Sequence, residues 1–465
     1  MVKEIKSMIR YNKTLPYIEE RESYQIPTSH LEKDGENSYR IVEGRRASER
    51  ILINNLRKAV DAWREADYPS VSSTTRILLD YWFNEDHLLK DERFNFWFCQ
   101  REAIETLVYL HEVRKYSDLI PVIEEYAEKS SRDLFNEANE FSESMEGIRK
   151  LIRYDESSDR MGERELPPLN LLRYAFKMAT GAGKTLAMAM IIVWSYFHKK
   201  KEKNSLLSDN FLLLTPNIIV YERLEKDFAS KIFREYPLVP PQWMPEWNLK
   251  ITLREDSSPL ASHGNLIVNN IQQLYESRKE LPPTMDDIMG VILGPKPQKD
   301  LTKPAVTLLE QIVKLDDVII INDEAYHVHS PDLEWHKTLM RIHSSLPKGI
   351  NLWLDFSATP KTQTGTYYPW IIVDYPLAQA VEDRIVKAPL IVKQINKKDP
   401  EVVTKDNVFR KYSTWIEAAI VRWKEHYKLY IKVGKKPVLF IMAEKNEHAD
   451  RIADSIRKDK RLGLK

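Results

Sequence analysis

A glycine-rich loop that carries a lysine is the strongest chemical signal in the sequence. Residues 178–185 read Met-Ala-Thr-Gly-Ala-Gly-Lys-Thr, in a chain that holds 13 glycines among 465 residues. Backbone N–H groups at such a turn bind phosphate, and the N-terminus of a following helix adds positive potential. We expect the side chain of Lys184 to reach the β- and γ-phosphates of a nucleotide, and the hydroxyl of Thr185 to bind Mg²⁺. The pattern predicts a site for ATP and Mg²⁺ formed by Thr180, Gly181, Ala182, Gly183, Lys184 and Thr185.

The neighbours of this loop support the prediction. An apolar stretch at residues 171–178 precedes it and a helical pattern at residues 186–197 follows, which is the strand–loop–helix context of a phosphate-binding loop. One position departs from the general pattern G-x-x-x-x-G-K-T, since Met178 stands where the pattern has glycine. The alternative, a chance glycine turn before Lys-Thr, does not explain these flanking elements.

Two adjacent carboxylates follow a second apolar stretch. Residues 318–321 predict a buried strand, and Asp323 and Glu324 come just after it. Hydrolysis of Mg²⁺–ATP needs one carboxylate that holds the metal, here Asp323, and one that orients the attacking water, here Glu324. Such a pair is often only a helix cap, but the upstream phosphate loop favours catalysis. We therefore expect Lys184, Asp323 and Glu324 to be catalytic, and Thr185 and Asp323 to bind the metal.

Three small residues after a further apolar stretch predict a coupling element. Ser357, Ala358 and Thr359 follow residues 352–356. The hydroxyl groups of Ser357 and Thr359 can hydrogen-bond to the acidic strand end and so relay the state of the bound nucleotide. His327 and His329 also lie near the acid pair, but no third ligand accompanies them. We expect a surface or coupling role for these histidines, in preference to a metal site.

Two more strand ends carry small polar residues. Thr215 and Pro216 follow the apolar residues 211–214, and Asn270 lies just beyond residues 266–268. Loops of this kind suit contacts to the phosphates of a nucleic-acid backbone, although plain turns have the same composition.

Gln100 is a candidate for reading the nucleotide base. It lies within Phe98-Cys99-Gln100-Arg101-Glu102, so its carboxamide would bind the adenine edge while an aromatic neighbour packs on the base. An ordinary helix start has the same pattern, and both interpretations stay open.

The elements that position these residues alternate between short apolar runs and helical stretches from about residue 171 onward. Runs at 171–178, 211–214, 266–268, 318–321, 352–356 and 438–441 predict strands buried on both faces. Such strands form a parallel sheet with crossover helices, an α/β fold that binds ligands at the carboxyl ends of its strands. Upstream, residues 48–66, 74–83 and 101–113 predict helices, and residues 118–160 are acidic and helical in pattern.

Composition limits the cellular setting. A single cysteine, Cys99, excludes an internal disulfide and a multi-cysteine zinc site. The N-terminus has no secretory pattern and no apolar run is long enough for a membrane span, so we expect a cytoplasmic protein without a membrane partner. From residue 387 onward the chain has 20 Lys and Arg against 10 Asp and Glu, although its overall net charge is +1. This basic segment suits a polyanion such as nucleic acid, or is a solvated surface.

The motifs, in this order, resemble those of superfamily 2 helicases. The similarity is closest to the restriction subunit of type III restriction enzymes and to related DEAD/DEAH-box proteins of bacterial defence. It rests on residues 178–185 (motif I), 215–216 (motif Ia), 323–326 (motif II), 357–359 (motif III) and 98–102, which are similar to a Q motif. Residues 376–387 resemble the link between two motor lobes, and residues 438–441 the first strand of the second lobe.

The resemblance implies a RecA-like parallel-sheet motor lobe after a helical N-terminal region, with the start of a second RecA-like lobe. The expected domains are residues 1–95 (accessory), 96–385 (first lobe, with an acidic helical insertion at about 115–165) and 386–465 (linker and incomplete second lobe). The implied function is an ATP-dependent helicase or translocase acting on DNA, or alternatively RNA, in a restriction or phage-defence system. Methyltransferase or nuclease subunits are the implied partners.

Two features depart from the family pattern. Motif II ends in Tyr326 where the family usually has His or Asp. The arginine-finger motif and a nuclease domain are not found, so we expect a truncated motor that binds ATP but hydrolyses it slowly by itself. Two other functions stay open: a nucleotide-gated DNA-binding or assembly subunit, and a P-loop kinase or signalling NTPase.

Overall fold

The chain divides into two compact units, one of Pro16–Ala388 and one that contains Pro389–Lys465. The computed structural model describes residues 22–35, 38–127, 140–143, 149–155, 160–216, 218–254, 256, 258–274, 308–325, 334–361, 367–387, 402–459 and 462. Each unit is described by itself.

A parallel sheet forms the centre of the first unit. Within the described residues it has seven strands, in the order β10-β11-β9-β12-β13-β8-β14, and every neighbouring pair is parallel. Their bounds are β8 Arg173–Met178, β9 Asn210–Thr215, β10 Lys250–Thr252, β11 Asn265–Asn270, β12 Val318–Asp323, β13 Ile350–Ser357 and β14 Ile371–Tyr375. The predicted α/β fold and the predicted strands at residues 171–178, 211–214, 266–268, 318–321 and 352–356 are confirmed, since each falls on one of these elements.

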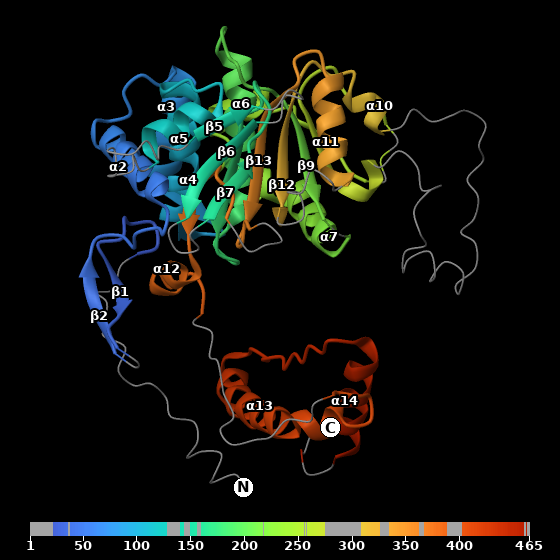
Figure 1. The fold of residues 1–465 in the computed structure, drawn as a ribbon. Helices are drawn as coiled ribbons and strands as arrows, with labels where there is room; N and C mark the ends of the chain where they lie inside the picture. Colours follow the sequence, from blue (N-terminus) through green and yellow to red (C-terminus); the bar gives the residue numbers. More distant parts are fainter. Residues whose placement is uncertain are drawn as a thin grey trace, which may run out of the picture. The chain divides into compact units, whose positions relative to one another are not determined.

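The strands are buried on both faces because their side chains alternate between two apolar clusters. In β12, Ile319 and Ile321 pack into the larger cluster, and Val318 and Ile320 into the smaller one. Helices cover both faces, with α2 to α5 gathered on one side and α10 and α11 on the other (Figure 1). The helices of this unit are α2 Ile51–Glu65, α3 Ser73–Asn84, α4 Phe98–Val108, α5 Leu119–Tyr126, α6 Lys184–Lys201, α7 Ile218–Lys226, α8 Ile232–Glu235, α10 Leu308–Ile312, α11 Glu334–Ser345 and α12 Leu377–Glu382.

Two π-helices continue α4 and α7, and two 3-10 helices stand apart from the α-helices. They are the π-helices η1 Tyr109–Val113 and η2 Asp227–Lys231, and the 3-10 helices η3 Pro241–Glu246 and η4 Ile271–Leu274. The helix predicted at residues 101–113 is therefore α4 followed by η1, a change of helical pitch that the apolar spacing did not indicate.

The N-terminal region packs with the central sheet and is not wholly helical. The predicted helices at residues 48–66 and 74–83 are α2 and α3, whose buried residues belong to the same cluster as the sheet. Two antiparallel hairpins accompany them: β1 Ser29–Lys33 with β2 Tyr39–Glu43, and β3 His87–Leu89 with β4 Glu92–Phe94. The turn of the second hairpin holds Lys90 and Asp91 at positive φ, as two-residue hairpin turns require.

The insertion expected to be helical at about 115–165 is largely a β-meander where it is described, so that prediction was wrong there. After α5 come β5 Glu140–Glu143, β6 Arg149–Asp155 and β7 Arg160–Glu165, which pair antiparallel in this order. Charged residues of opposite sign line up across the strands, as when Nζ of Lys150 contacts Oε2 of Glu163 at 2.8 Å. Such cross-strand pairs stabilise a sheet whose individual residues have low strand propensity.

Two helices make up most of the described part of the second unit. It contains α13 Val408–Tyr430, the 3-10 turn η6 Ile431–Val433 and α14 Asn446–Lys458. Of these, α13 and α14 share a small apolar core. The strand predicted at residues 438–441 is not assigned, since none of the described residues pairs with this segment. Its side chains do alternate as in a strand: Leu439 and Ile441 pack on the core, whereas Val438 and Phe440 are exposed. A strand needs a partner to complete its hydrogen bonds, and the described part of this unit provides none.

Candidate functional site

The predicted phosphate loop lies between β8 and α6. Gly181 and Gly183 have φ values of +86° and +75°, in the left-handed region that favours glycine. Gly183 immediately precedes α6, whose first N–H groups have no acceptor within the helix, the arrangement that binds anions. Met178, at the position that departs from the general pattern, is fully buried and pairs with Tyr375 as the last residue of β8. The loop therefore has the conformation that its glycines predict, and Met178 belongs to the strand.

The side chains of the loop differ in exposure. Lys184 is nearly buried, Thr185 is half-buried, and Thr180 is exposed together with Gly181. Ala182 is buried within the core. The two groups expected to contact phosphate and metal thus lie at the inner end of the loop.

The acid pair lies beside this lysine. Asp323 is the last residue of β12 and is 1% exposed, and Glu324 follows it with a φ of +52°. Oε1 of Glu324 is 3.6 Å from Nζ of Lys184. Oδ1 of Asp323 is buried and has no hydrogen-bond partner among the described residues. A buried carboxylate oxygen without a partner is costly, so Asp323 is suited to hold a cation.

Arg223 of α7 also contacts the acid pair, which the sequence did not indicate. Its Nη2 donates a hydrogen bond to Oδ2 of Asp323 at 2.7 Å. Burial raises the pKa of Asp323 and the charge of Glu324 adds to this, while the positive charges of Lys184 and Arg223 lower it; the net direction is upward. Arg223 is 100 residues from Asp323, and only the pairing of β9 with β12 brings α7 to this strand end.

The predicted coupling segment follows the strand between the loop and the acid pair. β13 pairs with β12 on one side and with β8 on the other. Ser357 is fully buried and its Oγ accepts a hydrogen bond from the N–H of Thr359 at 3.1 Å, whereas Thr359 is exposed and Ala358 half-buried. Beneath this segment Asp355 accepts hydrogen bonds from Asn322 and Arg173, both at 2.8 Å, which ties β13 to its two neighbours.

The candidate nucleic-acid residues share the same edge of the sheet, but their side chains are largely buried. Thr215 pairs with Asn270 at the ends of β9 and β11. Both side chains are buried, and Pro216 is half-buried. Contacts from this edge to a ligand would therefore use main-chain groups. Tyr326, His327 and His329 lie outside the described residues.

Gln100 lies against the phosphate loop, at the start of α4. Its Nε2 donates a hydrogen bond to the carbonyl oxygen of Gly183 at 3.3 Å. A Cβ atom at Gly183 would be 2.1 Å from this Nε2, so the glycine is required for the close approach. Gln100 therefore contacts the backbone of the phosphate loop, and its predicted contact with the adenine edge stays a prediction.

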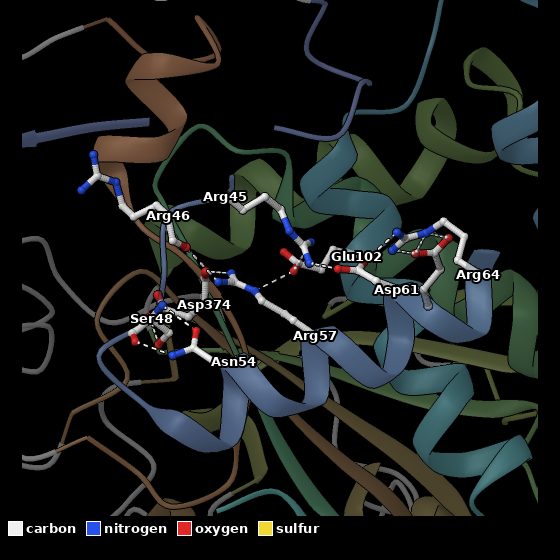
Figure 2. Close-up of polar contacts among 10 residues, drawn as sticks. Arg45, Arg46, Ser48, Asn54, Arg57, Asp61, Arg64, Glu102 and Asp374 are labelled. Atoms are coloured by element: carbon white, nitrogen blue, oxygen red, sulfur yellow. Dashed lines mark hydrogen bonds and ion pairs between the residues drawn. The ribbon is translucent and has the colours of Figure 1, made fainter. Parts of the chain in front are cut away.

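A network of buried ion pairs fixes α4 against α2 and β14 (Figure 2). Oε1 of Glu102 accepts hydrogen bonds from Arg45 at 3.0 Å and from Arg57 at 2.8 Å. Arg57 also donates to the carbonyl of Asp374 in β14, and Ser48 donates to the carboxylate of Asp374 at 2.6 Å. The sequence showed these residues only as scattered charges, because their partners are far away along the chain.

The described residues show neither a membrane-spanning helix nor a cluster of metal ligands. None of the described helices is both long and apolar enough to cross a membrane. No group of three or more His, Cys, Asp or Glu side chains with the spacing of a metal site occurs in the described parts of the chain.

Comparison with known families agrees with this arrangement. The family model of the type III restriction enzyme, res subunit, matches residues 127–362, slightly more than half of the chain. The matched region includes the phosphate loop, the Asp323-Glu324 pair and residues 357–359, and it excludes α2, α3, α4 and the second unit. No match was found among curated proteins. Since the family model covers the strands that carry the loop and the acid pair, the chain belongs to the type III restriction enzyme res subunit family, within helicase superfamily 2.

Proposed function

We propose that the chain binds Mg²⁺–ATP at the carboxyl edge of its parallel sheet and hydrolyses it to drive movement along DNA. Family membership supports a helicase-like motor and a general ATP hydrolase. The observation that carries the proposal is the 3.6 Å contact between Lys184 and Glu324, which joins the phosphate loop to the acid pair. DNA is the proposed substrate, a modification subunit the proposed partner, and the cytoplasm the proposed location.

The residues of the site fit a triphosphate and a metal ion. Bound Mg²⁺–ATP would supply a γ-phosphate made electrophilic by the metal. The hydroxyl of Thr185 and Oδ1 of Asp323, which has no hydrogen-bond partner in the described part of the chain, are oxygen ligands of the kind that Mg²⁺ prefers. Lys184 would place its charge beside the β- and γ-phosphates, and the carboxylate of Glu324 would orient a water molecule and accept its proton.

Movement along DNA requires that ATP binding and hydrolysis change the contacts of the protein with the nucleic acid. We infer that residues 357–359 carry this signal, because β13 lies between the strands of the loop and of the acid pair. Thr215, Pro216 and Asn270, at the ends of β9 and β11, would contact the phosphate backbone through main-chain N–H groups. The basic segment beyond residue 387 would add sequence-independent attraction.

Two substitutions test the proposed roles. Lys184→Ala should weaken binding of a fluorescent ATP analogue and lower ATP turnover by about 10²-fold or more, since a preorganised charge beside the phosphates is lost. Glu324→Gln should keep binding but lower turnover by about 10²–10⁴-fold, since the proton acceptor is lost. Lys203→Ala is the matched control, because this exposed lysine lies just beyond α6.

The result that would contradict the proposal is equal nucleotide binding by Lys184→Ala and the unaltered chain. Turnover should be measured with and without duplex DNA. Hydrolysis that DNA does not stimulate would favour a signalling NTPase, and DNA binding without hydrolysis would favour a nucleotide-gated assembly subunit.

A further inference from the structure

The N-terminal hairpin holds helix α12. β1 lies beside α12 (Figure 1), and Oε1 of Glu382, the last residue of this helix, accepts hydrogen bonds from the N–H of Leu31 at 3.2 Å and from Nη2 of Arg46. The side chain of Glu382 is 7% exposed, and Arg46 also donates to the carbonyl of Leu31. The hairpin and α12 both lie outside the residues that the family model matches, so family membership does not explain this contact.

The residues after α12 form a tight C-terminal cap. The N–H of Ile385 donates a hydrogen bond to the carbonyl of Ala380 at 3.0 Å, and the N–H of Arg384 donates one to the carbonyl of Val381, also at 3.0 Å. These two bonds define a Schellman motif, in which the residue after the C-cap is usually glycine because its φ is positive. Here Arg384 holds this position, with a φ of +59°. Arginine adopts this conformation only at a cost, so the contacts around the cap hold it in place.

A buried carboxylate ties the cap to the strand beside the phosphate loop. Asp383 is 4% exposed. Its Oδ2 accepts a hydrogen bond from the hydroxyl of Tyr375, and its Oδ1 accepts one from Nε2 of Gln379, both at 2.7 Å. The carbonyl of Tyr375 in turn accepts a hydrogen bond from the N–H of Ala179, within the phosphate loop, at 2.9 Å. Tyr375 therefore contacts both the cap and the loop.

The cap places the side chain of Val386 on the phosphate loop. The N–H of Val386 donates a hydrogen bond to the carbonyl of Ala380 at 3.0 Å. A Cβ atom at Gly181 would be 3.3 Å from Cγ2 of Val386, so this side chain lies against the glycine. Gly181 has a φ of +86°, and a glycine on which nothing packs has more conformational freedom than any other residue. The stiff, β-branched side chain of Val386 restricts that freedom.

We propose that Val386 is a positioning residue for the phosphate loop, and that Arg46 sets its place through Glu382 and α12. This inference rests on the proposed nucleotide site. A loop that is already ordered presents its N–H groups to phosphate without a further loss of backbone entropy, so the contact of Val386 strengthens the binding of every triphosphate. Since coupling between two sites is reciprocal, a ligand that displaces the N-terminal hairpin from α12 would weaken nucleotide binding.

The test is a double-mutant cycle on nucleotide affinity. Dissociation constants of Mg²⁺–ATP and Mg²⁺–tripolyphosphate are measured for the whole chain by competition against a fluorescent ATP analogue. Val386→Ala should weaken both about fivefold, because the loop regains freedom, whereas Val386→Ile keeps both γ carbons and should bind as the unaltered chain does. Arg46→Ala should weaken both about threefold, and it should have no further effect in the Val386→Ala background, because its effect passes through Val386.

Amide hydrogen exchange without nucleotide provides a second readout, which does not depend on the proposed nucleotide site. Exchange in residues 178–183 should become about threefold faster or more in Val386→Ala and in Arg46→Ala. Arg40→Ala is the matched control, since this arginine of β2 pairs with Glu32 and its side chain is 64% exposed; affinity and exchange should not change. Because Val386 is only partly buried, Val386→Ala tests the contact even where Arg46→Ala folds poorly.

Additive effects of Arg46→Ala and Val386→Ala on affinity would overturn the inference, since Arg46 would then act by a route other than Val386. Unaltered affinity and exchange in Val386→Ala would overturn it as well. If the unaltered chain binds neither triphosphate, the proposed nucleotide site fails, and exchange alone decides the inference. Faster exchange of the loop in both variants then supports the role of Val386, and unaltered exchange rejects it.

Discussion

Asp323 is a buried carboxylate whose burial disfavours the charge that metal binding would need. It is buried at the end of β12, where burial raises its pKa, yet in the proposed site it would present a charged oxygen to a metal ion. Two neighbouring cations favour the charged form. Arg223 contacts Oδ2 at 2.7 Å, and the charge of Lys184 also lowers the pKa of Asp323. Arg223 is 54% exposed on its side chain, so this cation can leave toward solvent. If the proposed site is right, Arg223 would therefore compete with Mg²⁺ for Asp323.

Replacing Arg223 by alanine should strengthen Mg²⁺-dependent nucleotide binding. Because an ion pair with a largely exposed arginine contributes about 0.5–1 kcal/mol, the half-saturating Mg²⁺ concentration should fall about two- to fivefold. Titration of Mg²⁺ at a fixed concentration of fluorescent ATP measures this shift. Arg223→Lys should show less of it, since the charge is kept, and Lys226→Ala, an exposed residue of the same helix, should show none. Weaker Mg²⁺ binding in Arg223→Ala would indicate that this residue holds the ligand and does not compete with it.

At the scale of elements, the contact between α2 and α4 depends on ionised Glu102. Burial by itself would raise the pKa of this carboxyl group, but the charges of Arg57 and Arg45 and the hydrogen bond from Arg57 outweigh burial and lower it from the ordinary value of 4.5. A folded-state pKa below the unfolded one means that the ionised group stabilises the fold above pH 4.5, and that this contribution is lost as pH falls through the lower, folded-state value.

Glu102→Gln should therefore destabilise the first unit in a pH-dependent manner. Breaking a buried ion pair typically costs about 3–5 kcal/mol, and we expect a loss of that size in the free energy of unfolding at pH 7. Urea unfolding at pH 7, 5 and 3 should show a wide gap between this variant and the unaltered chain at pH 7 and 5, and a narrower one at pH 3. The control is Glu65→Gln, an exposed carboxylate of α2, which should change little. A gap that is the same at all three pH values would mean that hydrogen-bond geometry, and not charge, holds the helices together.

At the scale of the whole molecule, the two units differ in how completely they bury their apolar residues. The strands of the first unit are covered on both faces, whereas Val438, Phe440 and Met442 of the second unit are 86%, 82% and 86% exposed. These residues alternate with Leu439 and Ile441, which pack on α13 and α14 as part of one cluster. An extended segment with one apolar face open, whose backbone pairs with no strand among the described residues, favours association with other chains.

Phe440→Lys should reduce self-association without loss of stability. The side chain of Phe440 is exposed to solvent, so the substitution removes an apolar group from the surface and leaves the small core intact. Light scattering against protein concentration measures association, and thermal unfolding measures stability. Leu439→Lys, one residue away, should have the opposite result, because this side chain packs on the core and its charge would be buried. Identical behaviour of the two variants would show that the segment does not keep this alternation in solution.

Much of the first unit could be predicted from local patterns. Apolar runs located β8, β9, β11, β12 and β13, since strands covered on both faces have no other composition. The helices of the N-terminal region followed from apolar residues at helical spacing. The β-meander at β5 to β7 could not be predicted in this way, because charges spaced for a helix also pair across strands.

The sequence by itself determined the chemistry: a loop that needs glycine at left-handed φ, a lysine after it, and two carboxylates at the end of a buried strand are all local properties. Only the tertiary structure decided which of these residues contact one another. The order of the strands brings Arg223 to Asp323, and the packing of α2 on α4 brings Arg57 and Arg64 to the buried Glu102 and Glu105. The packing of α4 beside the loop sets Gln100 against Gly183. These contacts join residues far apart along the chain, and no local preference encodes them, because each partner taken separately resembles an ordinary surface charge or helix start.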